Sequence, residues 1–439
     1  MRHLVIGIGD LAHLDDGTSG LINGNQMSDE NKLISKNMGI LINDGIIEKV
    51  QPQEELIDEY IPSMSKNLQK NFEILEINNI KITNAGGNAV IPGLIDSHTH
   101  LIWSGDRSNE VSLRMKGMSY REISEMGGGI KHTVTETRKS NEDLLIDLGA
   151  RRLKEALRNG TTAMEAKSGY GLNTESELRL TSIMNDLSID KNNPSIDITW
   201  MGAHDIPPKI DNKKISKSEY IEELINIQLP EIIEQGYARN CDVFCEPGWF
   251  SIEETERIID ASSKAGLSIR LHIDEFSNGN GAELAAKKNV ETADHALYST
   301  DEGREKMAKS NVIQGFLPGA PYTMGLDKWP PINQCIENEQ PWTISTDFNP
   351  NCRILSLPSI ASICVQRLGV NPLATLCAAT RNAASSVVHR TEKPHGMIKE
   401  GYVANINILN GEKWQGWCLQ QGSSPFKATI LEGNTVIHN

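Results

Sequence analysis

Short apolar runs alternate with longer amphipathic segments through the middle of the chain, between residues 91 and 390. A short apolar run bounded by turn residues predicts a buried strand, whereas a longer segment with helical spacing predicts a helix. The expected strands cover residues 90–97, 161–167, 196–204, 241–246, 267–274, 291–297, 311–316 and 341–347. Eight strands in alternation with helices predict an α/β fold, a (β/α)8 TIM-like barrel, rather than a doubly wound sheet.

The two ends of the chain lack this alternation and contain short strands and turns instead. Asn43-Asp44-Gly45 lies between two apolar runs, and Glu432-Gly433-Asn434 does so near the C-terminus. Glycine next to Asn or Asp between apolar runs predicts a β-hairpin. We therefore expect a small β-sandwich domain built from both termini, with residues 1–90 and 391–439 on either side of a barrel of residues 91–390.

Composition narrows the class of protein. The 439 residues carry 43 Lys and Arg against 58 Asp and Glu, a formal net charge of −15. Nucleic acid and anionic membranes bind basic surfaces, so this charge argues against both, and no apolar run approaches the roughly 20 residues of a membrane span. The start of the chain lacks the pattern of a secretory signal, and the seven cysteines contain no CxxC motif. We expect a cytoplasmic protein without a disulfide framework or a thiolate zinc site.

Three segments carry residues that commonly bind metal ions. His98 and His100 end the first expected barrel strand, and alternate strand residues share a face, so they lie roughly 6–7 Å apart on one side. His272 and Asp347 lie near the ends of the fifth and eighth expected strands. Each feature alone has an ordinary structural explanation: exposed histidines, a core histidine, or an N-cap aspartate. Together they predict a Zn²⁺ or Fe site of two or three imidazoles and a carboxylate, with a position left for water.

This set of ligands on barrel strands resembles the amidohydrolase superfamily. Binuclear members of that superfamily use a carbamylated lysine on the fourth strand. Residues 241–246 contain no lysine, and Lys167 belongs to the second expected strand, so the resemblance implies one metal ion per chain. His295, at the end of the sixth expected strand, would then lie beside the ion without binding it. Glu246 as a bridging ligand is the alternative.

More specific motifs resemble the imidazolonepropionase family within that superfamily. They are His98-Thr-His-Leu-Ile-Trp-Ser-Gly-Asp-Arg107, Gly127-Gly-Gly-Ile130, Lys167-Ser-Gly-Tyr-Gly-Leu172, Gly202-Ala-His204, His272-Ile-Asp-Glu275, Asp294-His295 and Ser345-Thr-Asp-Phe-Asn-Pro350. The resemblance implies hydrolysis of a ring C–N bond of 4-imidazolone-5-propanoate, which gives N-formimidoyl-L-glutamate in L-histidine degradation. It also implies a homodimer.

The same resemblance assigns roles to individual residues. The metal ligands would be His98, His100, His272 and Asp347. The catalytic residues would be Glu275, His295 and Asp347, with the role of general base open between Asp347 and Glu275. The substrate would contact Arg107, Tyr120, Tyr170, His204, Glu275, Asn349, Asn351 and Cys352. Arg107 would pair with the propionate, because a guanidinium binds a carboxylate through two hydrogen bonds, and Cys352 stands where the family pattern has a small hydroxyl residue.

Two other functions fit part of the pattern. A deaminase of guanine or cytosine type would use the same four ligands, but a neutral base does not need the cation and hydroxyl that Arg107 and Tyr170 provide. A barrel that had lost catalysis and served in binding or assembly would lack one or more ligands, and all four are present. An enzyme that acts on a small anion therefore explains more of the sequence.

Overall fold

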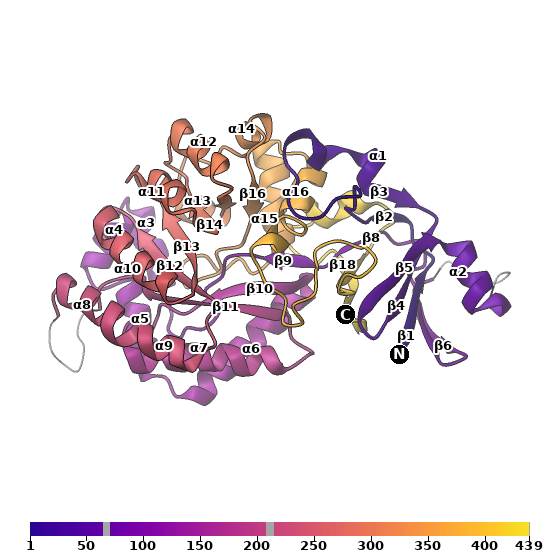
Figure 1. Cartoon of the computed structure of the whole chain (residues 1–439), viewed down its shortest axis with the longest axis horizontal. Coiled ribbons are helices and arrows are strands. Elements are labelled where there is room, and N and C mark those ends of the chain that lie inside the picture. The colour runs from indigo at the N-terminus through magenta and orange to yellow at the C-terminus, as the bar shows by residue number, and fades with distance from the viewer. Residues whose placement is uncertain (65–70, 208–214, 439) are drawn as a thin grey trace. The chain divides into compact units, whose positions relative to one another are not determined.

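The computed structural model describes residues 1–64, 71–207 and 215–438, and the chain separates into two compact units (Figure 1). Unit 1 comprises Met1–Asp96, Glu155–Ala163 and Ser356–Asn439, and unit 2 comprises Ser97–Lys154 and Met164–Leu355. All the predicted site residues belong to unit 2. Among the described residues, we find no helix with the length and apolar character to cross a bilayer.

Eight strands form one sheet in the order β9 to β16, with sequence neighbours side by side. They are β9 (Leu94–Asp96), β10 (Thr161–Lys167), β11 (Ser195–Ala203), β12 (Asn240–Cys245), β13 (Ser268–Ile273), β14 (Thr292–His295), β15 (Ile313–Phe316) and β16 (Trp342–Ile344). The pairs from β11 to β16 all run parallel. A parallel bridge between Thr99 and Phe348 joins the segments that follow β9 and β16, and the His100 N–H donates to the Phe348 carbonyl at 2.8 Å. The predicted (β/α)8 barrel is therefore confirmed, with its closure at this bridge.

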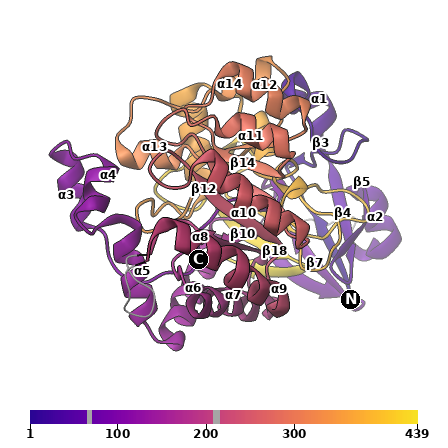
Figure 2. The ribbon, with the colours of Figure 1, turned by 60° about the vertical axis from the view of Figure 1, so that its left-hand side comes forward.

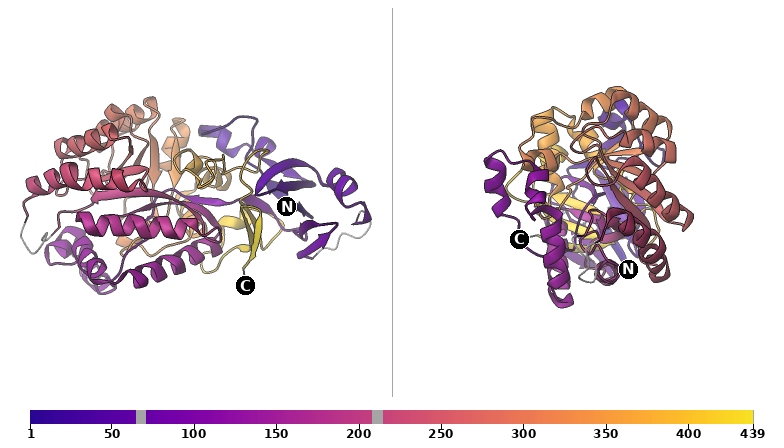
Figure 3. Two further views of the ribbon diagram at one scale, coloured as in Figure 1. Left: turned by 60° about the horizontal axis from the view of Figure 1, so that its bottom comes forward. Right: turned by 90° about the vertical axis from the view of Figure 1, so that its left-hand side faces the viewer.

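Helices follow the barrel strands and flank them in each view (Figures 1 and 3). They are α3 (Asn109–Met115), α4 (Tyr120–Glu125), α5 (Gly129–Lys139), α6 (Glu142–Arg158), α7 (Thr174–Ile189), α8 (Lys217–Glu223), α9 (Leu229–Gln235), α10 (Ile252–Lys264), α11 (Gly281–Lys288), α12 (Asp301–Lys309), α13 (Gly319–Met324) and α14 (Ile332–Glu337). α10 packs against β12 and β13 and buries Ile258 and Ile259. α3 and α4, by contrast, project beside α5 (Figure 2). They belong to the long connection between β9 and β10, which supplies part of the site.

Unit 1 contains two further sheets, with strand orders β5-β4-β1-β7-β6 and β19-β18-β17-β8-β2-β3. The strands are β1 (Arg2–Ile6), β2 (Asp10–Ala12), β3 (Ile34–Lys36), β4 (Met38–Asn43), β5 (Ile46–Pro52), β6 (Glu73–Ile77), β7 (Ile80–Asn84), β8 (Val90–Pro92), β17 (Ile406–Leu409), β18 (Phe426–Leu431) and β19 (Asn434–Ile437). The helices of this unit include α1 (Glu30–Leu33), α2 (Gln53–Tyr60), α15 (Leu357–Ser362) and α16 (Pro372–Ala378). Both predicted hairpins are confirmed, because β4 pairs with β5 and β18 with β19 in antiparallel fashion. The second sheet joins strands from both ends of the chain, as the sequence predicts.

The expected first barrel strand, residues 90–97, is two strands rather than one. β8 pairs with β17, whereas β9 begins the barrel sheet. Gly93 separates the two strands, and its N–H donates to the Asn405 carbonyl at 2.8 Å. A Cβ at this position would lie 2.3 Å from Thr162 Oγ1, so the close approach requires glycine. Both strands are completely buried, so the pattern of apolar residues does not show where one strand ends and the next begins.

Candidate active site

The ends of four barrel strands bring five residues of the histidine motifs together. His98 and His100 follow β9, His272 lies in β13, His295 ends β14, and Asp347 follows β16. Their potential ligand atoms form two groups in which all atoms lie within 4.8 Å of one another: His98, His100 and Asp347, and His98, His272 and His295. All five residues are buried. The four predicted ligands and His295 thus form one cluster, which we call the histidine cluster, with His98 common to both groups.

Carboxylates hold two of these histidines in place. His98 Nδ1 lies 2.6 Å from Asp294 Oδ2, and His272 Nδ1 lies 2.9 Å from Asp242 Oδ1. Asp242 is ionised and only accepts, so the proton of that hydrogen bond lies on His272 Nδ1, whereas burial raises the pKa of Asp294 to about 7. Burial lowers the pKa of His98 well below its ordinary value, which keeps that ring neutral. Neither Nε2 atom has a hydrogen-bond partner among the described residues.

This set of donor atoms fits a metal ion. A buried polar atom without a partner costs about 1–3 kcal/mol, yet His98 Nε2, His100 Nδ1 and His272 Nε2 are all in that position within the described structure. Asp347 Oδ1 lies 3.7 Å from His98 Nε2 and 3.8 Å from His100 Nε2. Neutral imidazoles and a carboxylate are ligands that Zn²⁺ and Fe accept. A bound ion would give His98 Nε2 and His272 Nε2 the partner that they lack among the described residues.

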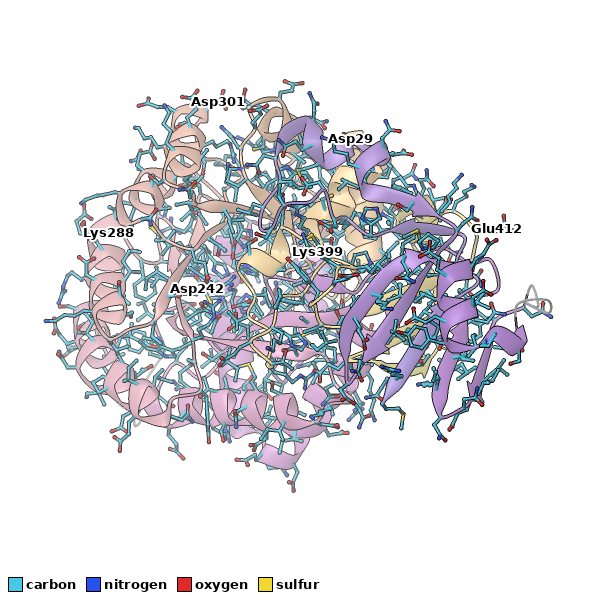
Figure 4. The ribbon with its side chains drawn as sticks, turned by 45° about the vertical axis from the view of Figure 1, so that its right-hand side comes forward. Asp29, Asp242, Lys288, Asp301, Lys399 and Glu412 are labelled. Atoms are coloured by element: carbon cyan, nitrogen blue, oxygen red, sulfur yellow. The ribbon has the colours of Figure 1, made fainter. Side chains whose placement is uncertain are left out.

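A cluster of buried charges supports the histidines from the barrel interior. Lys167 Nζ lies 2.7 Å from Asp242 Oδ2 and 2.9 Å from Glu165 Oε1, and all three side chains are fully buried. Burial alone would raise the pKa of Asp242, but His272 and Lys167 lower it further than burial raises it, so the carboxylate stays ionised. Asp242 lies among the barrel strands (Figure 4). The ionised carboxylate fixes the proton of His272 on Nδ1.

Asp242, Asp294 and Glu165 have no assigned role in the site predicted from the sequence. A signal for them exists, because each is a charged residue inside a strand of the barrel in which every residue is buried. Charged residues are almost never fully buried unless they are paired, so such positions indicate a partner inside the barrel. Glu165 and Lys167 even share a strand face, two residues apart.

Unfavourable backbone conformations mark the ends of three barrel strands. Asp274, His295 and Asp347 have φ values of +48°, +65° and +50°, in the left-handed region. For a residue other than glycine this conformation costs about 1–2 kcal/mol. Hydrogen bonds hold it in place: the Asp347 N–H donates to the His98 carbonyl at 3.1 Å, and the Ala296 N–H donates to the Ile273 carbonyl at 3.0 Å. Strain of this kind is concentrated at functional sites.

A pocket opens beside the histidine cluster. Its lining includes the predicted site residues His100, Arg107, Tyr120, Tyr170, His204, His272, Glu275, His295, Asp347, Asn349 and Asn351. Cys352 is not among the lining residues; its side chain is buried, its Sγ contacts the Thr346 carbonyl at 3.6 Å, and its N–H donates to Asn349 Oδ1. The structure therefore brings the predicted substrate contacts together apart from Cys352.

Arg107 is buried at the pocket with a carboxylate partner that the sequence analysis did not identify. Its Nε and Nη2 donate to the two oxygens of Glu110 at 3.0 and 2.9 Å, and both side chains are buried. Glu110 also accepts from the Gly129 N–H at 2.8 Å, so the loop of the Gly127–Gly129 motif is tied to the same ion pair. The guanidinium carbon lies 5.5 Å from the centre of the Tyr120 ring. Glu110 binds the Nε and Nη2 edge of the guanidinium, and Arg107 also lines the pocket.

Glu275 and His295 are neighbours in the lining of the pocket, with 3.7 Å between Glu275 Oε2 and His295 Nε2. Burial, with Asp347 and Glu246 nearby, raises the pKa of Glu275 well above its ordinary value. Burial also lowers the pKa of His295 well below its ordinary value, so burial favours the neutral form of both side chains. Glu246 accepts from the Glu275 N–H at 2.9 Å and from Ser277 Oγ at 2.8 Å, and it belongs to neither ligand group of the described residues.

Comparison with solved structures identifies the fold. The chain matches A. niger ochratoxinase with a TM-score of 0.65 and 17% identity, over 98% of this chain and 94% of that one. It matches a zinc-bound adenosine deaminase from Xanthomonas campestris with a TM-score of 0.65 and 12% identity, over 99% and 92% of the two chains. At these identities the likeness shows the fold, a (β/α)8 barrel accompanied by further sheets.

Curated relatives identify the family, although a search of protein-family models finds no match. The imidazolonepropionase of Alkaliphilus metalliredigens is 36% identical over 355 residues, which cover 80% of this chain and 82% of the relative. That of Shewanella sp. (strain ANA-3) is 35% identical over 405 residues, 91% and 93% of the two chains. That of Geobacillus kaustophilus is 33% identical over 409 residues, 92% and 91%. This chain belongs to the imidazolonepropionase family.

Proposed function

We propose that this chain hydrolyses 4-imidazolone-5-propanoate to N-formimidoyl-L-glutamate, a step of L-histidine degradation. The observation that carries the proposal is that a buried guanidinium and the histidine cluster share one pocket, because Arg107 and His272 both line it. A small substrate with a carboxylate tail and a hydrolysable ring needs both features at once. Membership of the imidazolonepropionase family supports the same substrate.

His98, His100, His272 and Asp347 would hold one metal ion, Zn or Fe. Such an ion supplies a water nucleophile at neutral pH by lowering the pKa of water from 15.7 to about 7, and it polarises a carbonyl group. Asp294 and Asp242 hold His98 and His272 through their Nδ1 atoms, which would leave both Nε2 atoms to bind the ion.

Asp347 would act as the general base. As the water oxygen bonds to the ring carbonyl carbon, the Asp347 carboxylate takes its proton, and it returns that proton to the ring nitrogen when the C–N bond breaks. Burial, with Asp347 and Glu246 nearby, raises the pKa of Glu275 well above its ordinary value, which favours Asp347 over Glu275 as the base. Its carboxyl instead orients the ring by hydrogen bonding. His295, a neutral imidazole 3.7 Å from Glu275, would donate a hydrogen bond to the oxyanion.

The remaining pocket residues would bind the substrate. Arg107 would hold the propionate with the guanidinium edge that Glu110 does not occupy. Burial raises the pKa of Tyr120 and of Tyr170, so both hydroxyls stay protonated and are available as donors. His204, Asn349 and Asn351 would complete the contacts, with Cys352 behind Asn349.

The family resemblance also supports a homodimeric cytoplasmic enzyme. We expect sedimentation of the purified protein to give twice the mass of one chain. A monomer at catalytic concentrations would remove the dimer from the proposal and leave the reaction untouched.

A direct assay tests the reaction. Freshly prepared 4-imidazolone-5-propanoate is incubated with the purified, metal-replete protein, and N-formimidoyl-L-glutamate is measured with and without a chelator. We expect product only when the metal is present. Parallel incubations with guanine and cytosine follow ammonia release. Ammonia from either base, or no product from the imidazolone, would contradict the proposal.

A further inference from the structure

We propose that Glu177 is a positioning residue for substrate binding: its buried carboxylate gathers backbone N–H groups of the loop that carries Tyr170 and thereby fixes Tyr170 and His204 in the pocket. The inference rests on the proposed function, because these two side chains are substrate contacts there. Glu177 lies in α7, and it belongs neither to the described lining of the pocket nor to the histidine cluster.

The carboxylate of Glu177 accepts hydrogen bonds from three residues of one short loop. Oε1 accepts from the Gly171 N–H at 2.7 Å and from the Leu172 N–H at 2.8 Å, and both oxygens lie 3.1–3.2 Å from the Gly169 nitrogen. The side chain is completely buried. Hydrogen bonds to an ionised acceptor are roughly twice as strong as those between neutral groups. One carboxylate therefore fixes the backbone on both sides of Tyr170.

The conformation of the loop fits this role. Gly169 and Leu172 have φ values of +89° and +50°. Left-handed residues in a tight turn direct successive N–H groups toward one point, which makes a concave site for an anion. A Cβ at Gly171 would lie 2.7 Å from Glu177 Oε1, so glycine is needed for the carboxylate to approach. The Lys167–Leu172 motif thus has a physical explanation: its glycines accommodate the carboxylate and the neighbouring histidine.

The loop determines the positions of two side chains that line the pocket, Tyr170 and His204. The Gly169 carbonyl lies 3.0 Å from His204 Nδ1, and because a carbonyl only accepts, that nitrogen carries the proton. The His204 ring lies 5.2 Å from the Tyr170 ring and stacks on His100 at 4.9 Å. A Cβ at Gly169 would come within 3.0 Å of His204 Nδ1, so the contact leaves little space. Displacement of the loop would move Tyr170 and leave His204 without its carbonyl partner.

Kinetics of two variants test the proposal. In Glu177→Gln the amide oxygen can keep the bonds to Gly171 and Leu172, but the NH2 group faces the Gly169 N–H as a second donor. In Glu177→Ala all the acceptors are lost. Because a small misplacement of contact groups can cost about 100-fold, we expect KM to rise about 100-fold in the alanine variant and about 10-fold in the glutamine variant. We expect kcat to change less than threefold and metal content to stay the same, and Glu175→Gln, an exposed change on the same helix, to match the wild type.

A double-mutant cycle separates positioning from a general structural role. Because Glu177 acts on the substrate through Tyr170, the effect of Glu177→Gln on KM should shrink when Tyr170 is already phenylalanine. Full additivity of Glu177→Gln and Tyr170→Phe, or equal losses in kcat and KM together with lost metal, would overturn the proposal.

Hydrogen exchange tests the loop without reference to any substrate. The amides of Gly169, Gly171 and Leu172 should exchange slowly in the wild type and at least 10-fold faster in Glu177→Ala, with the rest of unit 2 unchanged. Unchanged exchange would overturn the proposal even if the reaction is confirmed. Faster exchange in a protein that does not hydrolyse the imidazolone would show that the proposed function, rather than the role of Glu177 in the loop, has failed.

Discussion

The histidine cluster and the loop residues that line the same pocket are built from different parts of the same unit. Residues of the histidine cluster sit at the ends of barrel strands, and buried carboxylates hold His98 and His272. The loop residues come from the connections: Arg107 precedes α3, Tyr120 begins α4, and Tyr170 lies between β10 and α7. Barrel enzymes keep general chemistry on the strands and vary specificity in the loops. The strand residues should therefore control metal binding and turnover, and the loop residues should control KM.

We expect the largest loss of turnover from a change at Asp347, which follows barrel strand β16. Asp347→Asn keeps the size of the side chain but removes the base and the anionic ligand. General-base catalysis contributes about 10²–10⁴-fold, so we expect kcat to fall at least 10³-fold in protein that has been reloaded with metal. Steady-state assays with measured metal content check this. Near-normal turnover at full metal occupancy would remove Asp347 from the mechanism.

Asp294→Asn tests whether the carboxylates behind the histidines control the metal. An amide can present an N–H to His98 Nδ1, which would move the ring proton to Nε2 and occupy the metal-binding lone pair. Loss of such partners costs about 10–100-fold in metal affinity. Chelator competition should show a loss in this range, with KM for the substrate within threefold of the wild type. Asp260→Asn, an exposed change on α10, serves as the control.

Arg107→Ala tests whether the loop residues of the pocket control KM. Charge-assisted hydrogen bonds contribute about 1.5–3 kcal/mol, so we expect KM to rise roughly 10- to 100-fold while the metal stays bound. Glu110 would lose its partner as well, so a thermal unfolding curve must accompany the kinetics. An imidazolone that lacks the propionate should show no such dependence on Arg107. An unchanged KM for the full substrate would exclude Arg107 from substrate binding.

The smallest expected effect is a change of stability with pH at Glu246, which accepts hydrogen bonds from Glu275 and Ser277. Burial raises the pKa of Glu246 from 4.5 to about 7. A carboxyl with a raised folded pKa stabilises the protein fully below pH 4.5, and this contribution is lost as the pH rises through about 7. The shift corresponds to at most about 3 kcal/mol, or a few degrees in the unfolding midpoint. Wild type should therefore lose stability relative to Glu246→Gln between pH 4.5 and 8, and parallel curves would contradict the raised pKa.

Much of the barrel, and the clustering of the candidate ligands, could be predicted because both depend on local patterns. The order of the eight strands follows from apolar runs between helices, and His98, His100 and Asp347 come together because they follow the ends of neighbouring strands of one closed barrel. The division of residues 90–97 could not be predicted in this way. It depends on the contact of Gly93 with Thr162, which lies far away in the sequence. The spacing of apolar residues does not reveal such contacts.

The supporting residues of the site were harder to find than its ligands. Asp242, Asp294 and Glu110 act through partners that lie 3 to 196 positions away in the chain. A single aspartate or glutamate in a sequence gives no indication of which histidine or arginine it will meet. The resemblance to a known family supplied the pocket residues instead. It did not supply Glu177, whose three donors are backbone groups without a side-chain signature.

The bridge between Thr99 and Phe348 has a consequence for folding. His98 and His100 lie on one side of this seam and Asp347 on the other, so a single ion would fasten the two ends of a loop that contains nearly the whole of unit 2. Closing a long loop costs conformational entropy, and a bond across its ends repays part of that cost. The free energy of metal binding is then also free energy of barrel closure.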